Sequence, residues 1–270
     1  MITAPKTVLA ERLLYEIATD GHSPLVVKHS NKSWIVKSSL GQRTQYYLAN
    51  EVICSFLLQI WGFYIAPVSF VIIENHLLQN YKLKYNKAIY YKNTCVGIEL
   101  LENATEINGL LDKSIDEIPI DFDDPLSLLK LGLFDIWVEN DDRKPSNANL
   151  LIFENAAKTL TLLPIDHAFT FNSEAHRNLN PEWISSTYNQ SILNTRLAQT
   201  IAKKQRNFIE NDVKMFFFEQ IKHCEAHFDD IISSIPAEWQ LNQQDFAQLK
   251  AFLFNETRNN NIISEFQSRF

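Results

Sequence analysis

The chain has 270 residues, of which 46% are hydrophobic and 21% charged, with a formal net charge of -7. A chain of this length and apolar content can bury a sizeable core, which excludes disorder as the default interpretation. Because the acidic balance leaves no cluster of Lys and Arg to attract a phosphate backbone, we expect no direct nucleic-acid binding. An acidic site that requires cations is compatible with this composition.

Three widely spaced cysteines, Cys54, Cys95 and Cys224, form no Cys-x-x-Cys pair. This spacing predicts neither a disulfide framework nor a zinc site. Residues 1–20 lack the basic start, unbroken apolar stretch and small-residue cleavage site of a signal peptide. We therefore expect a cytoplasmic protein.

The first hundred residues contain several short runs typical of strands, with Asn, Ser or Gly between them. We expect strands at residues 24–29, 33–37 and 68–73, a further one at 88–91, and a helix at 46–61 that buries one face.

A membrane-spanning helix is the alternative for residues 52–73, which carry no charge over about the length of a span. Gln59, Gly62 and Pro67 interrupt this run. We therefore interpret it as the end of a buried helix, a turn and a strand, and expect no membrane association.

Beyond about residue 100 the pattern becomes mainly helical. An apolar helix is predicted for residues 125–139, followed by the polar stretch 140–149 and a hairpin over 150–165. Two amphipathic helical stretches follow, over residues 208–228 and 246–253. No internal repeat or low-complexity linker separates the two halves, so we interpret them as lobes with a boundary near residues 95–103.

The polar stretch after the apolar helix contains the first candidate chemistry. Asp142 and Asn147 have the spacing Asp-x-x-x-x-Asn. In phosphoryl transfer a carboxylate orients the attacking hydroxyl, and an amide oxygen a few residues later helps to hold magnesium. Because Asp, Asn, Ser and Pro are also common turn formers, the stretch taken alone is better explained as an ordinary solvated loop.

Asp166 ends the apolar run that forms the second strand of the hairpin. A carboxylate at this position needs a partner if it is buried, and a metal ion would provide one. Pairing with a turn amide or with His167 is the alternative. Considered together, the loop and the strand end supply an acid for positioning and two oxygen ligands, from Asn147 and Asp166, suited to a hard cation.

Lys37 ends the strand predicted at residues 33–37, on the face opposite to Trp34. A lysine that points inward needs an anion, and Glu51 on the helix predicted at 46–61 is a matching candidate. In kinases a Lys-Glu pair of this kind positions the phosphates of ATP. Either residue alone is better explained as a solvated surface charge.

Taken in chain order, these motifs resemble those of the HipA-like kinase family, and the resemblance covers most of the chain. The matching motifs are Ile35-Val36-Lys37, Asn50-Glu51, Asn140-x-Asp142-Arg143-x-x-x-Asn147-x-Asn149-Leu150 and Ile165-Asp166-His167. Further matching segments are Gly21-His22-Ser23, the turn over residues 62–67, and Ile235-Pro236-Ala237-Glu238-Trp239 before a final helix. The polar loop is also similar to that of phosphatidylinositol kinases, in which Asp-Arg begins the catalytic sequence.

The resemblance implies an α+β fold with the two lobes of a protein kinase. Residues 1–98 would form a small β-rich N-lobe with one helix, residues 99–270 would form a larger helical C-lobe, and ATP would lie in the cleft between them. Asp142 would be the catalytic acid or base, and Asn147 and Asp166 would hold magnesium.

The remaining residues that the resemblance implies surround the nucleotide. Lys37 would contact the ATP phosphates as a second catalytic residue, and Glu51 would brace it. Further cofactor-binding residues would be Gly21, His22 and Ser23 near the phosphates, Glu99 and Leu100 in the adenine-binding hinge, and Asn149.

The activity that the resemblance implies is magnesium-dependent transfer of the γ-phosphoryl group of ATP to Ser or Thr of a protein. The resemblance also implies a cognate antitoxin or another regulatory partner. Two departures bear on this: the Gly21 segment has no Gly-x-Gly-x-x-Gly pattern, and His167 follows Asp166 where eukaryotic protein kinases have Phe-Gly. An inactive nucleotide-binding or scaffold protein of the same fold, and a small-molecule or lipid kinase, remain as alternatives.

Overall fold

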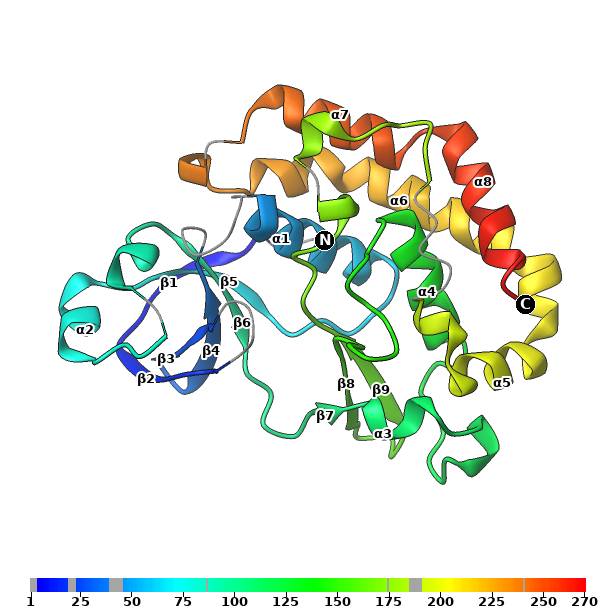
Figure 1. Cartoon of the computed structure of the whole chain (residues 1–270), viewed down its shortest axis with the longest axis horizontal. Helices are drawn as coiled ribbons and strands as arrows, with labels where there is room; N and C mark the ends of the chain where they lie inside the picture. Colours follow the sequence, from blue (N-terminus) through cyan, green and yellow to red (C-terminus); the bar gives the residue numbers. More distant parts are fainter. Residues whose placement is uncertain are drawn as a thin grey trace.

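The computed structural model describes residues 4–18, 23–38, 46–85, 87–173, 175–184, 191–239 and 241–270. The larger of two β-sheets lies on one side of the molecule, and three helices, α6 (Val213–Ser233), α7 (Gln243–Leu253) and α8 (Glu256–Gln267), lie on the other (Figure 1). Strands predominate before residue 100 and helices after it. The α+β class expected from the sequence is confirmed.

The larger sheet has six strands in the order β1-β5-β6-β4-β3-β2. Its strands are β1 (Lys6–Leu9), β2 (Arg12–Glu16), β3 (Leu25–His29), β4 (Lys32–Lys37), β5 (Val68–Ile72) and β6 (Cys95–Glu99). Neighbouring strands are antiparallel except β1 and β5, which run parallel. The strands predicted at 24–29, 33–37 and 68–73 correspond to β3, β4 and β5.

The expectation of a strand at residues 88–91 was wrong, because Ala88–Tyr91 is a 3-10 helix. The six-stranded sheet already has β1 and β2 at its two edges. The segment instead closes a turn, in which the Tyr90 N–H donates to the Lys87 carbonyl at 2.9 Å, and it buries Tyr91 in the core.

Three strands of this sheet escaped prediction for identifiable reasons. β1 and β2 are edge strands: β1 is mostly exposed, and β2 has two adjacent leucines, so neither shows the alternation of a half-buried strand. β6 contains Gly97, a residue that is uncommon inside strands. A Cβ there would lie 2.4 Å from the Val71 Cγ2, so the close packing of β5 on β6 requires glycine.

The buried helix α1 (Tyr46–Ile60) crosses the middle of the molecule and connects the sheet to the helical part (Figure 1). It packs on β6 and on α6. Residues 52–73 form the end of α1, a turn at Gly62 and then β5, as predicted, and no helix in the described ranges is long and apolar enough to cross a membrane. The short helix α2 (Asn75–Asn80) is a second helix before residue 98, where one was expected.

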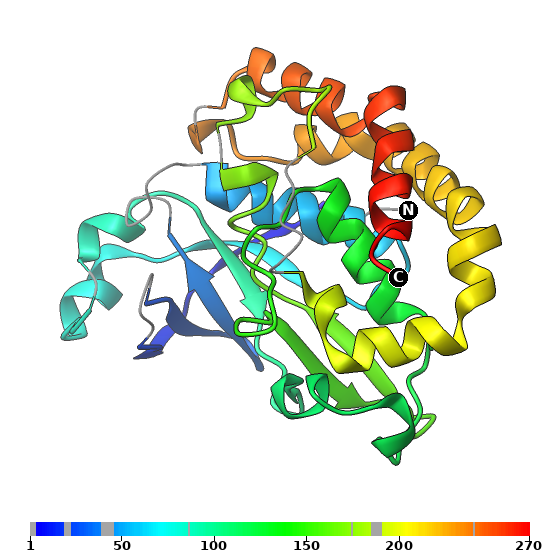
Figure 2. The ribbon, with the colours of Figure 1, turned by 45° about the vertical axis from the view of Figure 1, so that its right-hand side comes forward.

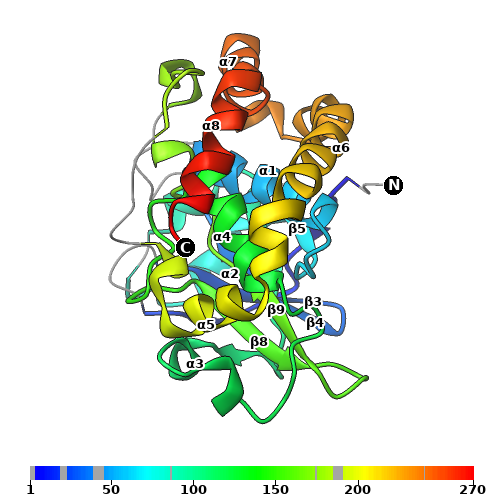
Figure 3. The ribbon, with the colours of Figure 1, turned by 90° about the vertical axis from the view of Figure 1, so that its right-hand side faces the viewer.

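The helical part is built around α4 (Ser127–Trp137), which forms within the predicted range 125–139. Figures 2 and 3 show α4 enclosed by neighbouring helices, and it packs on α8 and on α5 (Arg196–Lys204). Trp137 of α4 stacks on Trp61 at a centroid distance of 5.6 Å, which extends one core from the end of α1 into the C-terminal helices.

The predicted hairpin consists of β8 (Leu150–Glu154) and β9 (Leu160–Pro164). It lies beside α4, and β7 (Thr105–Glu106) adds a third strand. The amphipathic stretch predicted from residue 208 begins as a π-helix (Phe208–Asp212) that continues into α6, and α3 (Asn108–Leu111) is a single short turn.

Candidate active site

Lys37 at the end of β4 contacts two carboxylates that come from distant parts of the chain. Its Nζ donates to Glu51 Oε1 on α1 and, at 2.9 Å, to Asp166 Oδ1 just after β9. The Glu51 side chain is 1% exposed and the Lys37 side chain 13%, whereas the Asp166 side chain is 38% exposed. The structure thus brings together three of the residues singled out in the sequence, with the Asp166 carboxylate accessible from solvent.

The ionisation of this cluster follows from burial and mutual charge. Burial opposes the charged form of Lys37, but the carboxylates of Asp166 and Glu51 outweigh it and raise the Lys37 pKa. Burial likewise opposes the anionic form of Asp166, yet the Lys37 ammonium lowers the pKa of that carboxyl. Lys37 is therefore a fixed cation and Asp166 a fixed anion over the physiological pH range.

Asp142 is held by the two amides that follow it in the loop. Asn147 Nδ2 donates to Asp142 Oδ1 at 2.9 Å, and Asn149 Nδ2 donates to Asp142 Oδ2 at 2.8 Å. The backbone N–H of Asp142 in turn donates to Asn140 Oδ1 at 3.2 Å. Because Asn147 uses its NH2 group on Asp142, its amide oxygen, the atom that a hard cation prefers, is left for another partner.

The buried guanidinium of Arg143 ties this loop to the strand that ends at Asp166. It pairs with Asp135 of α4 at 3.0 Å and donates to the carbonyls of Ala148, at 3.1 Å, and Asn149. It also contacts His167 Nδ1 at 3.2 Å. Burial, together with the charge of Arg143, lowers the His167 pKa well below its ordinary value, so that this imidazole is neutral and accepts from Arg143.

Two residues of the cluster adopt left-handed backbone conformations that non-glycine residues rarely occupy. Asn149 has a φ of 45° and Asp166 a φ of 55°. The Ile165 N–H donates to the Asn149 carbonyl at 3.0 Å, which joins the two positions directly. Such conformations cost free energy and collect at functional sites, so their occurrence at Asn149 and at Asp166, the neighbour of the residue bonded to Asn149, marks this junction as a candidate active site.

A cleft with a volume of about 200 Å3 opens beside this junction. Its walls are mainly aliphatic and come from the sheet, the β6–β7 connection and the β8–β9 hairpin; they are Ile17, Pro24, Ile35, Lys37, Ala66, Ile98, Glu99, Leu100, Leu101, Leu151, Leu163, Ile165 and Asp166. An apolar cleft that ends in a Lys and an Asp suits a ligand with a flat apolar part and an anionic part.

The two predicted hinge residues line this cleft, and one polar group of each has a partner within the protein. The Glu99 carboxylate pairs with Lys32 at 2.5 Å, and the Leu100 N–H donates to the Ser33 carbonyl at 2.8 Å. Aliphatic wall residues such as Leu151 and Leu163 were not singled out in the sequence. The sequence pattern of the hairpin does not reveal which of its two faces lines a cleft and which packs in the core.

The predicted phosphate segment is described only in part. Gly21 and His22 lie outside the described residues. Ser23 is buried, and its carbonyl accepts a hydrogen bond from the Tyr91 hydroxyl at 3.4 Å. Asn149, predicted to bind the cofactor, donates from its side chain to Asp142 Oδ2 at 2.8 Å.

A buried polar network that the sequence did not reveal fastens α1 to the segment after Asp166. Asn50 Nδ2 donates to the carbonyls of Ala168, at 3.0 Å, and Thr170, at 3.3 Å, and Asn50 Oδ1 accepts from His176 Nε2 at 2.8 Å. Because Asn50 precedes Glu51 on α1, this network fixes the helix that carries the Lys37 partner. Asn50 appeared in a motif, but its partners are more than a hundred residues away.

The donor set fits a hard, six-coordinate cation better than a soft one. No group of three or more His, Cys, Asp or Glu side chains is arranged for metal binding in the described part of the chain. The Asn147 amide oxygen and the Asp166 carboxylate are oxygen donors, which magnesium prefers, and magnesium commonly binds with only one or two protein ligands plus phosphate and water. These residues could hold such an ion together with a phosphate-bearing ligand.

The sequence model of HipA-like kinases matches residues 23–268, which is nearly the whole chain. The chain belongs to the HipA-like kinase family. The enzyme class expected from the sequence, a phosphotransferase, is confirmed by this membership. No significant match was found among curated proteins.

The fold of this HipA-like kinase is similar to that of a solved kinase. The crystal structure of the proinflammatory kinase CtkA of Helicobacter pylori matches it with a TM-score of 0.53 at 12% sequence identity, over 96% of this chain and 95% of that one. The likeness confirms the kinase-like fold expected from the sequence.

Proposed function

We propose that this kinase transfers the γ-phosphoryl group of ATP to a hydroxyl group of a protein Ser or Thr in a magnesium-dependent reaction. The contact that carries the proposal is the Lys37 ammonium held between Glu51 and Asp166 at the end of the apolar cleft. The adenine ring would lie between the aliphatic walls, and the phosphates would extend toward Lys37. Residues 1–98 and 99–270 would be the two lobes around the nucleotide.

In the proposed mechanism Asp142 acts on the acceptor. The hydroxyl oxygen forms a bond to the γ-phosphorus, the bond from that phosphorus to the bridging oxygen of ADP breaks, and the hydroxyl proton passes to Asp142. The amides of Asn147 and Asn149 hold the two oxygens of this carboxylate, which fixes its orientation toward the acceptor.

Charge stabilisation would come from a second group of residues. Lys37 would bind the phosphates, and Glu51 would keep its ammonium in place. Asn147 and Asp166 would hold the magnesium ion, which supplies neutralisation of phosphate charge when bound. Family membership is the support for a protein acceptor, for a cytoplasmic location and for control by a cognate antitoxin or another regulatory partner.

Thermal unfolding with ATP, with Mg2+, and with both ligands tests the nucleotide site. At a ligand concentration about a hundredfold above Kd, binding to the native state adds about 2.7 kcal/mol of stability. For a chain of this size, this corresponds to a rise in Tm of roughly 5–10 °C. We expect the rise only with both ligands, and its loss in Asp166→Ala. Asp230→Ala, which removes an exposed carboxylate from α6, is the matched control.

Transfer is tested separately with the variant Asp142→Ala. We expect it to keep the shift produced by ATP and Mg2+ but to lose transfer of radiolabelled phosphate, because Asp142 acts on the acceptor. Incubation of the wild-type enzyme with cell protein, lipid and small-molecule fractions identifies the acceptor class. Label on a lipid or a small molecule alone would contradict the proposed protein acceptor, and an Asp142→Ala variant with full transfer would contradict the assigned role.

A further inference from the structure

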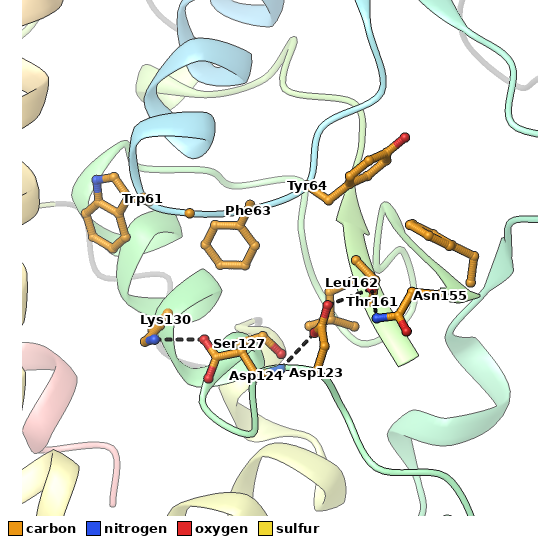
Figure 4. Close-up of a pocket in the computed structure, with 12 residues that line it drawn as sticks. Trp61, Phe63, Tyr64, Asp123, Asp124, Ser127, Lys130, Asn155, Thr161 and Leu162 are labelled. Atoms are coloured by element: carbon orange, nitrogen blue, oxygen red, sulfur yellow. Dashed lines mark hydrogen bonds and ion pairs between the residues drawn. The ribbon is translucent and has the colours of Figure 1, made fainter. Parts of the chain in front are cut away.

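A second cavity, with a volume of about 450 Å3, shares no lining residue with the cleft beside Asp166. It forms where the turn after α1, the start of α4 and the outer half of the β8–β9 hairpin meet (Figure 4). Its lining residues are Trp61, Gly62, Phe63, Tyr64, Asp123, Asp124, Ser127, Lys130, Phe153, Asn155, Thr161 and Leu162. Its volume is that of a small-ligand or side-chain pocket.

Aromatic side chains form much of the wall. Tyr64 is 44% exposed and meets Phe153 edge to face at a centroid distance of 5.0 Å, and Phe63 lies nearly buried below the turn. Aromatic faces attract planar cations and pack well against the aliphatic stems that carry them. This wall therefore favours an organic cation over a hydrated inorganic ion.

One carboxylate in the cavity is oriented without being neutralised. Asp123 Oδ2 accepts from the Thr161 hydroxyl at 2.6 Å, and Asp123 Oδ1 accepts from the Asp124 N–H at 2.8 Å. Neighbouring Asp124 pairs with Lys130 at 2.7 Å, whereas no cationic side chain within the described ranges pairs with Asp123. The cavity thus offers one oriented, solvent-exposed carboxylate without an ion-pair partner in the part of the chain that the structure describes, which favours a cationic ligand.

A second polar group in the cavity is independent of the carboxylates. Ser127, at the start of α4, is 7% exposed and lines the cavity. Its hydroxyl has no hydrogen-bond partner among the described residues and can therefore bond to a ligand in the cavity. A ligand that donates to Ser127 and to Asp123 would satisfy both groups.

We propose that this cavity binds an arginine side chain presented by a protein partner. A guanidinium has several N–H donors in one plane, so it can bond to Asp123 and Ser127 while its face and aliphatic stem rest on Tyr64 and Phe153. A lysine ammonium is a compact, strongly hydrated charge and would use the aromatic wall less well. The proposal does not depend on ATP or on phosphoryl transfer, so its test is made without nucleotide.

The experiment is saturation-transfer NMR with N-acetyl-arginine amide as the probe and N-acetyl-citrulline amide as its uncharged counterpart. We expect transfer to the arginine probe with little or none to the citrulline probe. Asp123→Asn should weaken binding of the arginine probe about tenfold, since a hydrogen bond to a charged group is lost. Asp121→Asn removes an exposed carboxylate two residues away, outside the cavity, and should leave the affinity unchanged.

Two further variants keep the test decisive if Asp123→Asn folds poorly. Tyr64→Ala removes an exposed ring and Ser127→Ala a single hydroxyl, and each should weaken binding by about threefold or more. The proposal is overturned if the citrulline probe binds equally well, if neither variant changes the affinity, or if spermidine binds and the arginine probe does not.

Discussion

Replacing Arg143 by methionine should destabilise the fold more than any exposed substitution of the same kind. The guanidinium is fully buried, pairs with the buried Asp135 carboxylate at 3.0 Å and bonds to the carbonyls of Ala148 and Asn149. Arg143→Met keeps an unbranched apolar stem but has no charge or donor, so the Asp135 carboxylate would be left buried without a cationic partner. Removing one partner of a buried ion pair typically lowers the free energy of unfolding by about 3–5 kcal/mol, which is a large part of the stability of a domain.

Urea unfolding near neutral pH, followed by tryptophan fluorescence, measures this loss. Arg206→Met is the matched control, because Arg206 pairs with Glu210 on the surface with its side chain 79% exposed, and the expected loss there is below about 1 kcal/mol. The double variant Asp135→Leu/Arg143→Met removes the stranded carboxylate and should recover most of the stability. A loss below about 1 kcal/mol for Arg143→Met would refute the assignment of Arg143 as the link between the loop and α4.

Three other predictions concern stability. Gly132→Ala should cost about 1–3 kcal/mol in urea unfolding, because the added Cβ would lie 2.2 Å from Leu193 Cδ2, whereas Gly109→Ala has open space and should cost nothing. Burial raises the pKa of Asp135 to about 6. The protonated carboxyl therefore stabilises the fold below the ordinary pKa of aspartate, and this contribution is lost as the pH rises through about 6. Relative to Asp135→Asn, the wild type should become less stable over this range. Burial lowers the pKa of His176 to about 4, so acidification from about pH 6.5 to 4 should destabilise the wild type more than His176→Gln, as seen in Tm against pH.

Elements whose side chains are buried in a regular pattern were predictable from the sequence. The helices α1 and α4 and both strands of the β8–β9 hairpin carry dense apolar runs, and they formed at or within the predicted ranges. The edge strands β1 and β2 have no such run, and β6 contains Gly97. These strands exist because of their neighbours in the sheet, which a local pattern does not contain.

The same distinction applies to the candidate site. Lys37 and Glu51 could be paired in advance, because an inward lysine on a strand requires an anion on the adjacent helix. Other contacts join residues that only the folded chain brings close. Asn50 bonds to the segment after Asp166, and Arg143 in the loop contacts both Asp135 of α4 and His167. The roles assigned to Asp142, Asn147 and Asp166 in catalysis and metal binding remain predictions for the experiments above.

The parallel pairing of β1 with β5 has a consequence for the order in which the sheet can assemble during synthesis. Lys6 pairs with Ser69, so β1 must wait for a partner that is synthesised about sixty residues later. The β2–β3 and β3–β4 pairs join neighbours in the chain and can close earlier. β1 is therefore among the last strands of this sheet to be incorporated, and a nascent chain halted before β5 would carry it as an unpaired segment.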